Sequence, residues 1–202
     1  MFKEIESVVF DFGGVIIDLY PQRTFDKLRQ SLGIDAEAEF KQLALDIELG
    51  EISAEKFLES VNDLCGNRVS LTELEQTWNA MLGEIDPAKV LFLEQLKKHY
   101  KVYLLSNTNI VHKNYFDITC NKSFGMSMED FFHKTIYSHE ISMRKPDRGI
   151  FEYLIQTLNL SPNKILFIDD LEENILMAKE LGIQTKQFER NGNFDCLRNL
   201  II

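Results

Sequence analysis

Short runs of apolar residues recur along the chain, and stretches with helical periodicity separate them. The first run spans residues 7–10, and similar runs span 101–105 and 165–168. Residues 135–138 offer a weaker strand, and residues 184–188 offer a short further one. Strands that are apolar on both faces are typical of a parallel sheet covered by helices on both sides. The alternation of these strands with helices therefore predicts an α/β fold with a Rossmann-like parallel sheet.

Residues 20–83 show a different pattern, in which apolar residues recur at helical spacing and no convincing strand occurs. Trp78 lies on the apolar face of the last helix in this block, where it is expected to pack in a core. We therefore predict a core domain of residues 1–19 and 84–202, into which an all-helical cap domain of residues 20–83 is inserted. Because the cap follows the first strand directly, it is well placed to act as a lid over the ligand-binding edge of the sheet.

The composition is that of an ordinary globular protein, and its charge limits the possible partners. The 202 residues carry a formal net charge of -10 at pH 7, and the sequence pI is near 4.9. Nucleic acid and anionic membranes would be repelled by such a chain, so we expect neither as a partner. A local basic site could still bind a small anionic metabolite.

The sequence also favours a cytoplasmic location. No apolar run approaches the length that spans a bilayer, and acidic residues occupy the N-terminus where a signal peptide needs a basic and then an apolar stretch. Cys65, Cys120 and Cys196 are far apart and show neither a disulfide nor a zinc-binding pattern. We expect a monomer or a weak homodimer.

Polar side chains follow the predicted strands at their carboxyl ends. They are Asp11 after the first strand, Ser106 and Asn107 after the second, and Asp169 and Asp170 after the fourth. In a parallel sheet these ends meet at one edge, where ligands bind. Carboxylates that converge there repel one another unless a cation lies between them, and a site with oxygen ligands alone suits Mg²⁺.

Lys145 adds a fixed positive charge to this set. Pro146 follows it and holds the lysine in extended backbone just before a helix. Carboxylates, a hydroxyl group, a lysine and a divalent cation together are typical of a phosphoryl-transfer site.

The order of these segments resembles the four motifs of the haloacid dehalogenase-like superfamily, in its branch with a helical cap after the first motif. The segments are Asp11-Phe12-Gly13-Gly14-Val15, Leu104-Leu105-Ser106-Asn107, Arg144-Lys145-Pro146-Asp147, and Phe167-Ile168-Asp169-Asp170 with Asn174. The turn Gly50-Glu51-Ile52-Ser53, together with Ser106-Asn107-Thr108-Asn109 and Met143-Arg144-Lys145-Pro146, is similar to bacterial sugar phosphatases that act on α-D-glucose 1-phosphate. The resemblance implies a Mg²⁺-dependent phosphatase of small phosphomonoesters, with sugar phosphates as the expected substrates.

The resemblance also implies a role for each motif residue. Asp11 would be the nucleophile that attacks phosphorus and forms an aspartyl-phosphate. Ser106 and Asn107 would bind the phosphoryl oxygens. Lys145 would neutralise charge on the nucleophile and on the phosphate.

The implied Mg²⁺ ligands are Asp11, Asp170 and the backbone carbonyl of Gly13, with Asp169 acting through water. Further substrate contacts are expected from Gly14 in the first motif, Arg23 at the crossing into the cap and Glu51 in a cap turn.

Gly13 departs from the family pattern, since phosphatases of this family usually carry a second aspartate at that position. This acid protonates the leaving oxygen and then activates water, and general acid–base catalysis contributes about 10²–10⁴-fold. Three explanations remain open: a good leaving group such as an anomeric sugar oxygen, substitution by His112 or a bound water, or loss of catalysis.

Two alternative functions follow from the same departure. A metal-independent 2-haloacid dehalogenase also lacks the second acid, but it needs no carboxylate pair after the fourth strand, so Asp169 and Asp170 count against it. A non-catalytic or regulatory binding protein would keep the fold without turnover. The receiver-type phosphoacceptor form of that alternative is disfavoured by the helical block between the first two strands.

Overall fold

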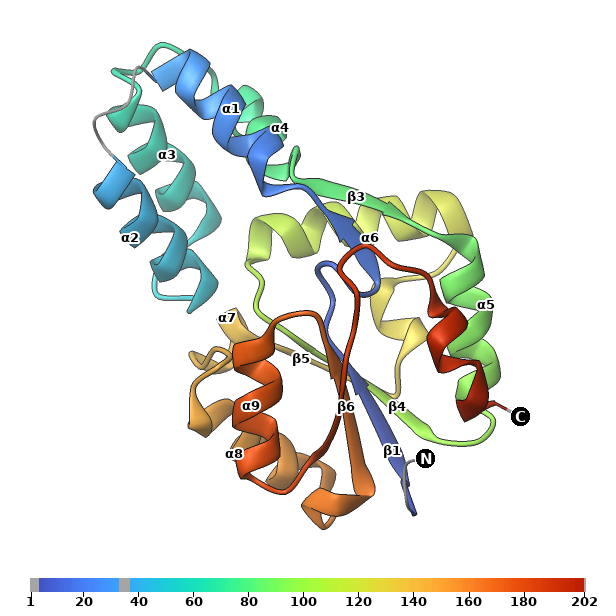
Figure 1. Ribbon diagram of the computed structural model, residues 1–202. Coiled ribbons are helices and arrows are strands. Elements are labelled where there is room, and N and C mark those ends of the chain that lie inside the picture. Colours follow the sequence, from blue (N-terminus) through green and yellow to red (C-terminus); the bar gives the residue numbers. More distant parts are fainter. Residues whose placement is uncertain (1–3, 33–36, 202) are drawn as a thin grey trace.

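A parallel sheet of five strands forms the centre of the protein in this computed structural model, which describes residues 4–32 and 37–201 (Figure 1). The strands are β1 (Ser7–Phe10), β4 (Lys101–Ser106), β5 (Lys134–Tyr137), β6 (Ile165–Asp169) and β7 (Gln184–Gln187). They lie in the order β5-β4-β1-β6-β7, and every neighbouring pair is parallel. The predicted α/β fold with a Rossmann-like sheet is confirmed, and β1 occupies its middle.

Helices cover both faces of this sheet, which explains why its central strands β1 and β6 are buried along their whole length. One face carries α5 (Pro87–Leu96), α6 (Ile110–Phe124) and the 3₁₀ helix η3 (Phe194–Leu200), and the other carries α8 (Arg148–Leu158) and α9 (Glu172–Glu180). Val8 and Phe10 pack in the first cluster, whereas Val9 between them packs in the second. Shorter helical turns are η1 (Met128–Phe131), α7 (Ser138–Ile141) and η2 (Pro162–Lys164).

Two short strands join the core to the helical insertion. β2 (Ile17–Leu19) leads into it and β3 (Leu82–Ile85) leads out, and the two pair antiparallel. Gly83 allows their backbones to approach closely, because a Cβ on it would lie 2.7 Å from the carbonyl oxygen of Asp18. The apolar pattern does not predict this ribbon, since both strands are very short and β3 contains a glycine and a glutamate.

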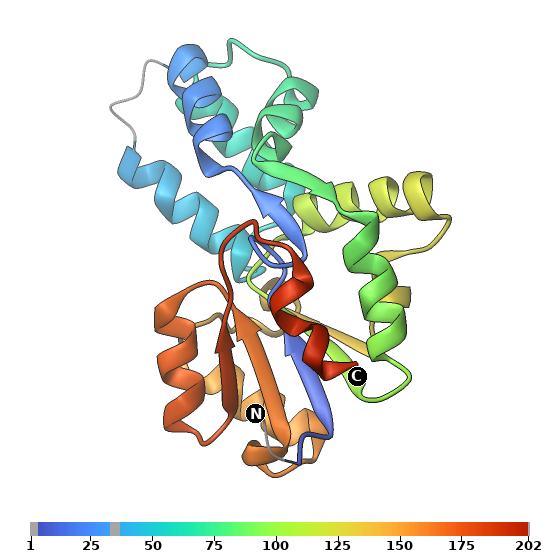
Figure 2. The ribbon, with the colours of Figure 1, turned by 45° about the vertical axis from the view of Figure 1, so that its right-hand side comes forward.

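The described part of the cap is built from helices that lie beyond the carboxyl end of the sheet (Figure 2). They are α1 (Pro21–Leu32), α2 (Glu37–Glu48), α3 (Ala54–Leu64) and α4 (Leu71–Asn79). They agree with the helical periodicity of the insertion, while the exact domain boundaries stay a prediction. Among the helices described, none is both long enough and apolar enough to cross a lipid bilayer.

The turn between α2 and α3 seats the cap on the core. Gly50 lies in this turn with a φ of 70°, and a Cβ on it would lie only 2.0 Å from the carbonyl oxygen of His139 in α7. No side chain fits at that separation, so this contact requires glycine. The contact between Gly50 and His139 therefore limits how closely the cap approaches the core.

Trp78 forms a second contact between cap and core. Its ring packs against Phe40 and Phe57 inside the cap, as the helical spacing predicts, and it also stacks on His112 of α6 with a centroid distance of 5.0 Å. The indole Nε1 donates to Asn109 Oδ1 at 3.4 Å. Burial lowers the pKa of His112 to about 4, although the Trp78 carbonyl raises it in part. Trp78 thus joins the cap core to the sheet domain.

Replacing Gly50 with alanine should lift the cap from the core. Gly125→Ala is a matched control, because Gly125 has a φ of 67° and nothing lies within 4 Å of its Cβ position. Both variants bear the cost of a left-handed backbone, about 1–2 kcal/mol, but only Gly50→Ala adds a steric clash. Hydrogen exchange in α2 and α7 should rise in Gly50→Ala alone. Equal protection in the two variants would contradict the close contact between Gly50 and His139.

The buried His112 should contribute a loss of stability in weakly acidic solution. Its pKa moves from 6.5 in the unfolded chain to about 4 in the native one, so between these values the unfolded chain binds the extra proton. This contribution should amount to about 2 kcal/mol between about pH 7.5 and about pH 5, while the raised pKa of Asp11 acts in the opposite direction over the same range. Chemical denaturation of wild type and of His112→Asn at both pH values therefore isolates the histidine.

The variant His112→Asn should lose this part of the pH dependence, whereas His99→Asn, at an exposed position, should keep it. An unchanged pH dependence in His112→Asn would show that the buried imidazole does not titrate as described.

Candidate active site

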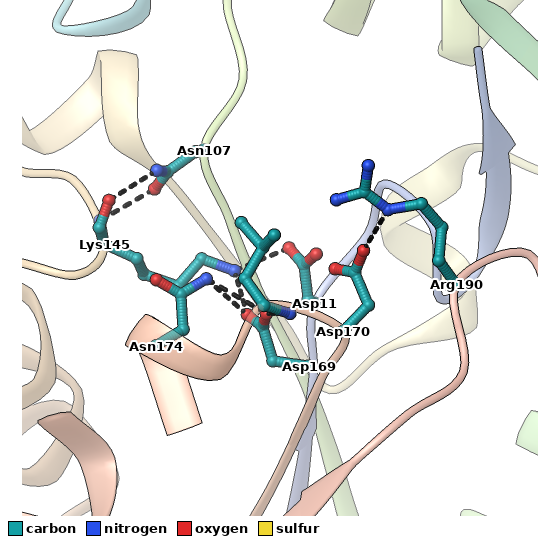
Figure 3. A network of polar contacts seen from close by, with 8 residues as sticks. Asp11, Asn107, Lys145, Asp169, Asp170, Asn174 and Arg190 are labelled. Carbon is teal, nitrogen blue, oxygen red and sulfur yellow. Dashed lines mark hydrogen bonds and ion pairs between the residues drawn. The ribbon is translucent and has the colours of Figure 1, made fainter. Parts of the chain in front are cut away.

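Carboxylates from two neighbouring strands meet at the carboxyl end of the sheet (Figure 3). Asp11 follows β1, Asp169 is the last residue of β6, and Asp170 comes next. Each of the three offers a carboxylate oxygen, and these oxygens lie within 4.8 Å of one another. The parallel register places Phe10 beside Ile168, so acids far apart in the sequence become neighbours.

Lys145 lies between two of these carboxylates and is almost fully buried, with 2% of its side chain exposed. Its Nζ donates to Asp11 Oδ1 at 2.5 Å and to Asp169 Oδ2 at 2.8 Å. Burial lowers the pKa of Lys145, but the two negative charges raise it more, so the net shift is upward. The lysine therefore stays charged and offsets part of the repulsion between the carboxylates.

The pKa of Asp11 is raised to about 7. Burial is the largest cause and the charge of Asp169 adds to it, whereas Lys145 and the backbone N–H of Phe12 lower it. A further cation at this site would favour the ionised carboxylate, because its attraction opposes the cost of burial.

The carboxylate of Asp169 is surrounded by hydrogen-bond donors. Asn174 Nδ2 lies 3.0 Å from Oδ1 and 2.9 Å from Oδ2, and the backbone N–H of Leu171 donates to Oδ1 at 2.8 Å. Lys145 donates to Oδ2 as well. Asp169 is thus held rigidly and has little capacity left for a direct metal bond, in keeping with the expected contact through water.

Asn107 positions Lys145 through its side chain. Its Nδ2 donates to the carbonyl oxygen of Lys145 at 2.8 Å, and its Oδ1 accepts from the Lys145 backbone N–H at 2.8 Å (Figure 3). The amide oxygen and one N–H of Asn107 thus hold the lysine segment, while the amide nitrogen has a second N–H. The structure adds a positioning role for Asn107, and its expected contact with a phosphoryl oxygen stays a prediction.

Arg190 is a partner of the site that the sequence motifs do not reveal. Its Nε lies 2.5 Å from Asp170 Oδ2, and the side chain of Asp170 is 2% exposed. Gly14, with a φ of 82°, permits this arrangement, since a Cβ on it would lie 2.9 Å from Asp170 Oδ2 and 3.2 Å from Arg190 Cγ. Gly14 therefore makes room for the carboxylate and its arginine, which differs from the expected contact with substrate.

The donor set fits a magnesium ion. Asp11 and Asp170 offer carboxylate oxygens at the distances that a shared cation requires, and Mg²⁺ prefers such hard ligands. Burial and the charge of Asp169 raise the pKa of Asp11 even with Lys145 in place, and a cation held by the cluster would oppose that shift. The residues that would hold the ion are Asp11, Asp170 and the carbonyl of Gly13, with Asp169 behind them.

A cavity of about 190 Å³ lies between the core and the cap beside this cluster. The hinge, formed by β2 and β3, contributes Ile17, Leu19 and Leu82, and the cap side contributes Ala44, Glu48, Trp78 and Met81. The remaining lining residues belong to the core: Phe12, Gly13, Ser106, Asn107, Thr108, Asn109, His112 and Phe116. Ser106, at the end of β4 and 1% exposed, reaches the cavity as the sequence predicts. This volume suits a small molecule.

Two expected substrate contacts lie outside this cavity. Arg23 is exposed, its guanidinium lies 3.9 Å from the centroid of the Tyr20 ring, and it lines a larger groove of about 1240 Å³ beside the hinge. Glu51 is exposed in the turn between α2 and α3. The geometry does not support a substrate contact for either residue, because a place on a crossing or in a turn does not fix the direction of a side chain.

Known proteins are similar to this chain over almost its whole length. It is 32% identical over 198 residues to the D-ribitol-5-phosphate phosphatase of Bacteroides thetaiotaomicron, which covers 94% of this chain and 95% of that protein. A haloacid dehalogenase family enzyme of the same organism, solved with magnesium and inorganic phosphate, superposes with a TM-score of 0.87 at 32% identity and covers 96% of this chain and 98% of that one.

A 2-haloacid dehalogenase from Pseudomonas syringae superposes with a TM-score of 0.61 at 14% identity, covering 98% of each chain, and this likeness shows the fold alone. A sequence profile of haloacid dehalogenase-like hydrolases matches residues 5–182. With the acids, the lysine and the inserted helical cap in the arrangement described above, this match shows that the chain belongs to the haloacid dehalogenase-like hydrolase family.

Proposed function

We propose that the protein is a Mg²⁺-dependent phosphatase that hydrolyses small phosphomonoesters of sugars or polyols through an aspartyl-phosphate on Asp11. The observation that carries the proposal is the buried contact of Asp11 with Lys145 beside the carboxylate of Asp170. The similarity to a sugar-alcohol phosphate phosphatase supports the same class of substrate.

The side chains at the site suit two successive displacements at phosphorus. Asp11 attacks phosphorus, the bond to the leaving oxygen breaks, and water then attacks the aspartyl-phosphate to release inorganic phosphate and the free carboxylate. Lys145 favours the ionised form of Asp11 and faces the transferred group, and Ser106 offers its hydroxyl as a donor from the end of β4. When bound, Mg²⁺ supplies further neutralisation of the phosphoryl charge.

The proton for the leaving oxygen has no obvious donor among the carboxyl groups, because residue 13 is glycine. His112 lines the cavity, but with a pKa of about 4 it is neutral at physiological pH and is a poor acid. This favours water as the donor, or a substrate whose leaving oxygen needs little assistance.

We also propose that the protein acts in the cytoplasm, as a monomer or a weak homodimer, on a small phosphorylated metabolite and not on nucleic acid or membranes. The net charge of -10 supports the exclusion of these polyanionic partners. The enclosed cavity of about 190 Å³ supports a metabolite of modest size.

Asp11→Asn should abolish phosphate release, because the amide cannot act as the nucleophile. The expected loss of kcat is about 10³-fold or more, measured as phosphate released from D-ribitol 5-phosphate and from p-nitrophenyl phosphate. Asp63→Asn, on the exposed surface of α3, should keep wild-type turnover. Turnover by Asp11→Asn within about tenfold of wild type would overturn the nucleophile assignment.

Removal of Mg²⁺ by a chelator should lower turnover by about 100-fold or more, and added Mg²⁺ should restore it. Asp170→Asn should need about tenfold or more Mg²⁺ for half-maximal activity, because one anionic ligand is lost. Without Mg²⁺, release of halide from a 2-haloacid would instead support the dehalogenase alternative. Full phosphatase activity in excess chelator would contradict the assigned role of the ion.

A further inference from the structure

Glu48, the last residue of α2, is the cap residue that brings a carboxylate to the cavity. Its Oε1 accepts a hydrogen bond from Arg144 Nε of the core at 2.7 Å, across a sequence separation of 96 residues. The two side chains are only partly exposed, at 24% for Glu48 and 36% for Arg144. The ion pair therefore spans the junction of cap and core next to the proposed site.

This contact is connected directly to the catalytic cluster. Arg144 precedes Lys145, whose Nζ binds Asp11 and whose backbone is held by Asn107. On the cap side, Gly50 follows Glu48 by two residues and sits against the core at His139. Glu48 is thus fixed from both sides, and its position relative to Asp11 is set by short, well-packed segments.

The charge of Glu48 is distinctive within the cavity. Among the described residues that line it, Glu48 alone carries a formal charge. Its neighbours on the cap side, Ala44, Trp78 and Met81, present mainly apolar surface. Within residues 4–32 and 37–201, no hydrogen bond reaches Oε2, so this oxygen keeps its full capacity as an acceptor.

The amide groups on the core side are already occupied. Asn107 uses both ends of its side chain on Lys145, and Asn109 Oδ1 accepts from the backbone N–H of His112 and from Trp78 Nε1. A hydroxyl group that enters the cavity must find an acceptor there, because an unpaired buried hydroxyl is costly. Among the described residues that line the cavity, Glu48 offers the one ionised acceptor, and charged acceptors form the stronger hydrogen bonds.

We propose that Glu48 is a specificity-determining residue that accepts a hydrogen bond from a hydroxyl group on the carbon chain of the substrate. This inference rests on the proposed function, since the phosphoryl group is taken to sit at Asp11. The hydrogen bond to Glu48 selects phosphate esters of neutral, hydroxyl-rich chains over esters whose organic part has no hydroxyl. Arg144 is the positioning residue that aims the carboxylate.

The test compares two phosphate esters in wild type and Glu48→Ala. D-ribitol 5-phosphate is rich in hydroxyls, and p-nitrophenyl phosphate has none. The ratio of kcat/KM for the first ester to that for the second should fall about tenfold or more in Glu48→Ala, mainly through KM of the polyol ester. Glu48→Gln, which keeps an acceptor oxygen and the side-chain volume, should regain part of the ratio.

Glu152→Gln is the matched control. Glu152 also accepts from an arginine, Arg148 Nε, at 2.7 Å, but this pair lies on the exposed surface of α8 away from the cap. Glu152→Gln should leave the ratio of kcat/KM for the two esters unchanged. If Glu48 served only to close the cap, Glu48→Ala would impair both esters alike, and a ratio within about twofold of wild type would overturn the proposal.

Binding separates this inference from the proposed function. Calorimetry with Mg²⁺ present, in an Asp11→Asn background that should not turn the ester over, gives Kd for D-ribitol 5-phosphate and for inorganic phosphate, and their ratio should shift about tenfold when Glu48→Ala is added. If the wild-type protein hydrolyses neither ester but Glu48→Ala still shifts the ratio of Kd values, the phosphatase function is contradicted and the hydrogen bond to Glu48 is supported. Hydrolysis of both esters with no shift in either ratio would support the phosphatase and overturn the role of Glu48.

Discussion

The burial of the Asp11 carboxylate beside Asp169 and Asp170 is the constraint on which the rest of the structure depends. Burial raises the pKa of Asp11 to about 7, the charge of Asp169 adds to the shift, and the contact with Lys145 offsets only part of it. Positively charged side chains from distant segments of the chain offset part of this negative charge. Lys145 lies between Asp11 and Asp169, and Arg190 pairs with Asp170. The negative charge that these two side chains leave uncompensated favours the binding of a divalent cation.

The cap depends on the same arrangement, because burial is the largest cause of the raised pKa of Asp11. A seated cap keeps bulk water from the cavity and strengthens every charge interaction inside it. Three contacts seat it: Gly50 on the His139 carbonyl, Trp78 on His112, and Glu48 on Arg144. The last of these ends one residue from Lys145, so the position of the cap and the position of Lys145 are linked through one short segment.

Local features of this structure could be predicted from the sequence, and long-range ones could not. The strand that ends at Asp11 and the strand that ends at Asp169 are recognisable because an apolar run and its terminal acid are adjacent in the chain. Parallel pairing then brings the acids together by a general rule. Arg190 gave no such signal, since a single arginine after a short polar strand resembles any surface residue.

The hinge and the role of Asn107 escaped prediction for related reasons. The ribbon of β2 and β3 depends on pairing between segments that the whole cap separates, and each strand is too short to show a period. The side chain of Asn107 binds the Lys145 backbone, a partner that only the folded chain reveals. A Cβ on Gly13 would lie 3.2 Å from Cδ2 of Leu19, at the end of a side chain in β2, and Leu19 pairs with Leu82 of β3. A longer residue at position 13 would therefore need the Leu19 side chain to shift by a few tenths of an ångström, so this position is coupled to the segment that attaches the cap. In the proposed mechanism, Lys145 and a divalent ion compensate charge where relatives with the second aspartate also use proton transfer.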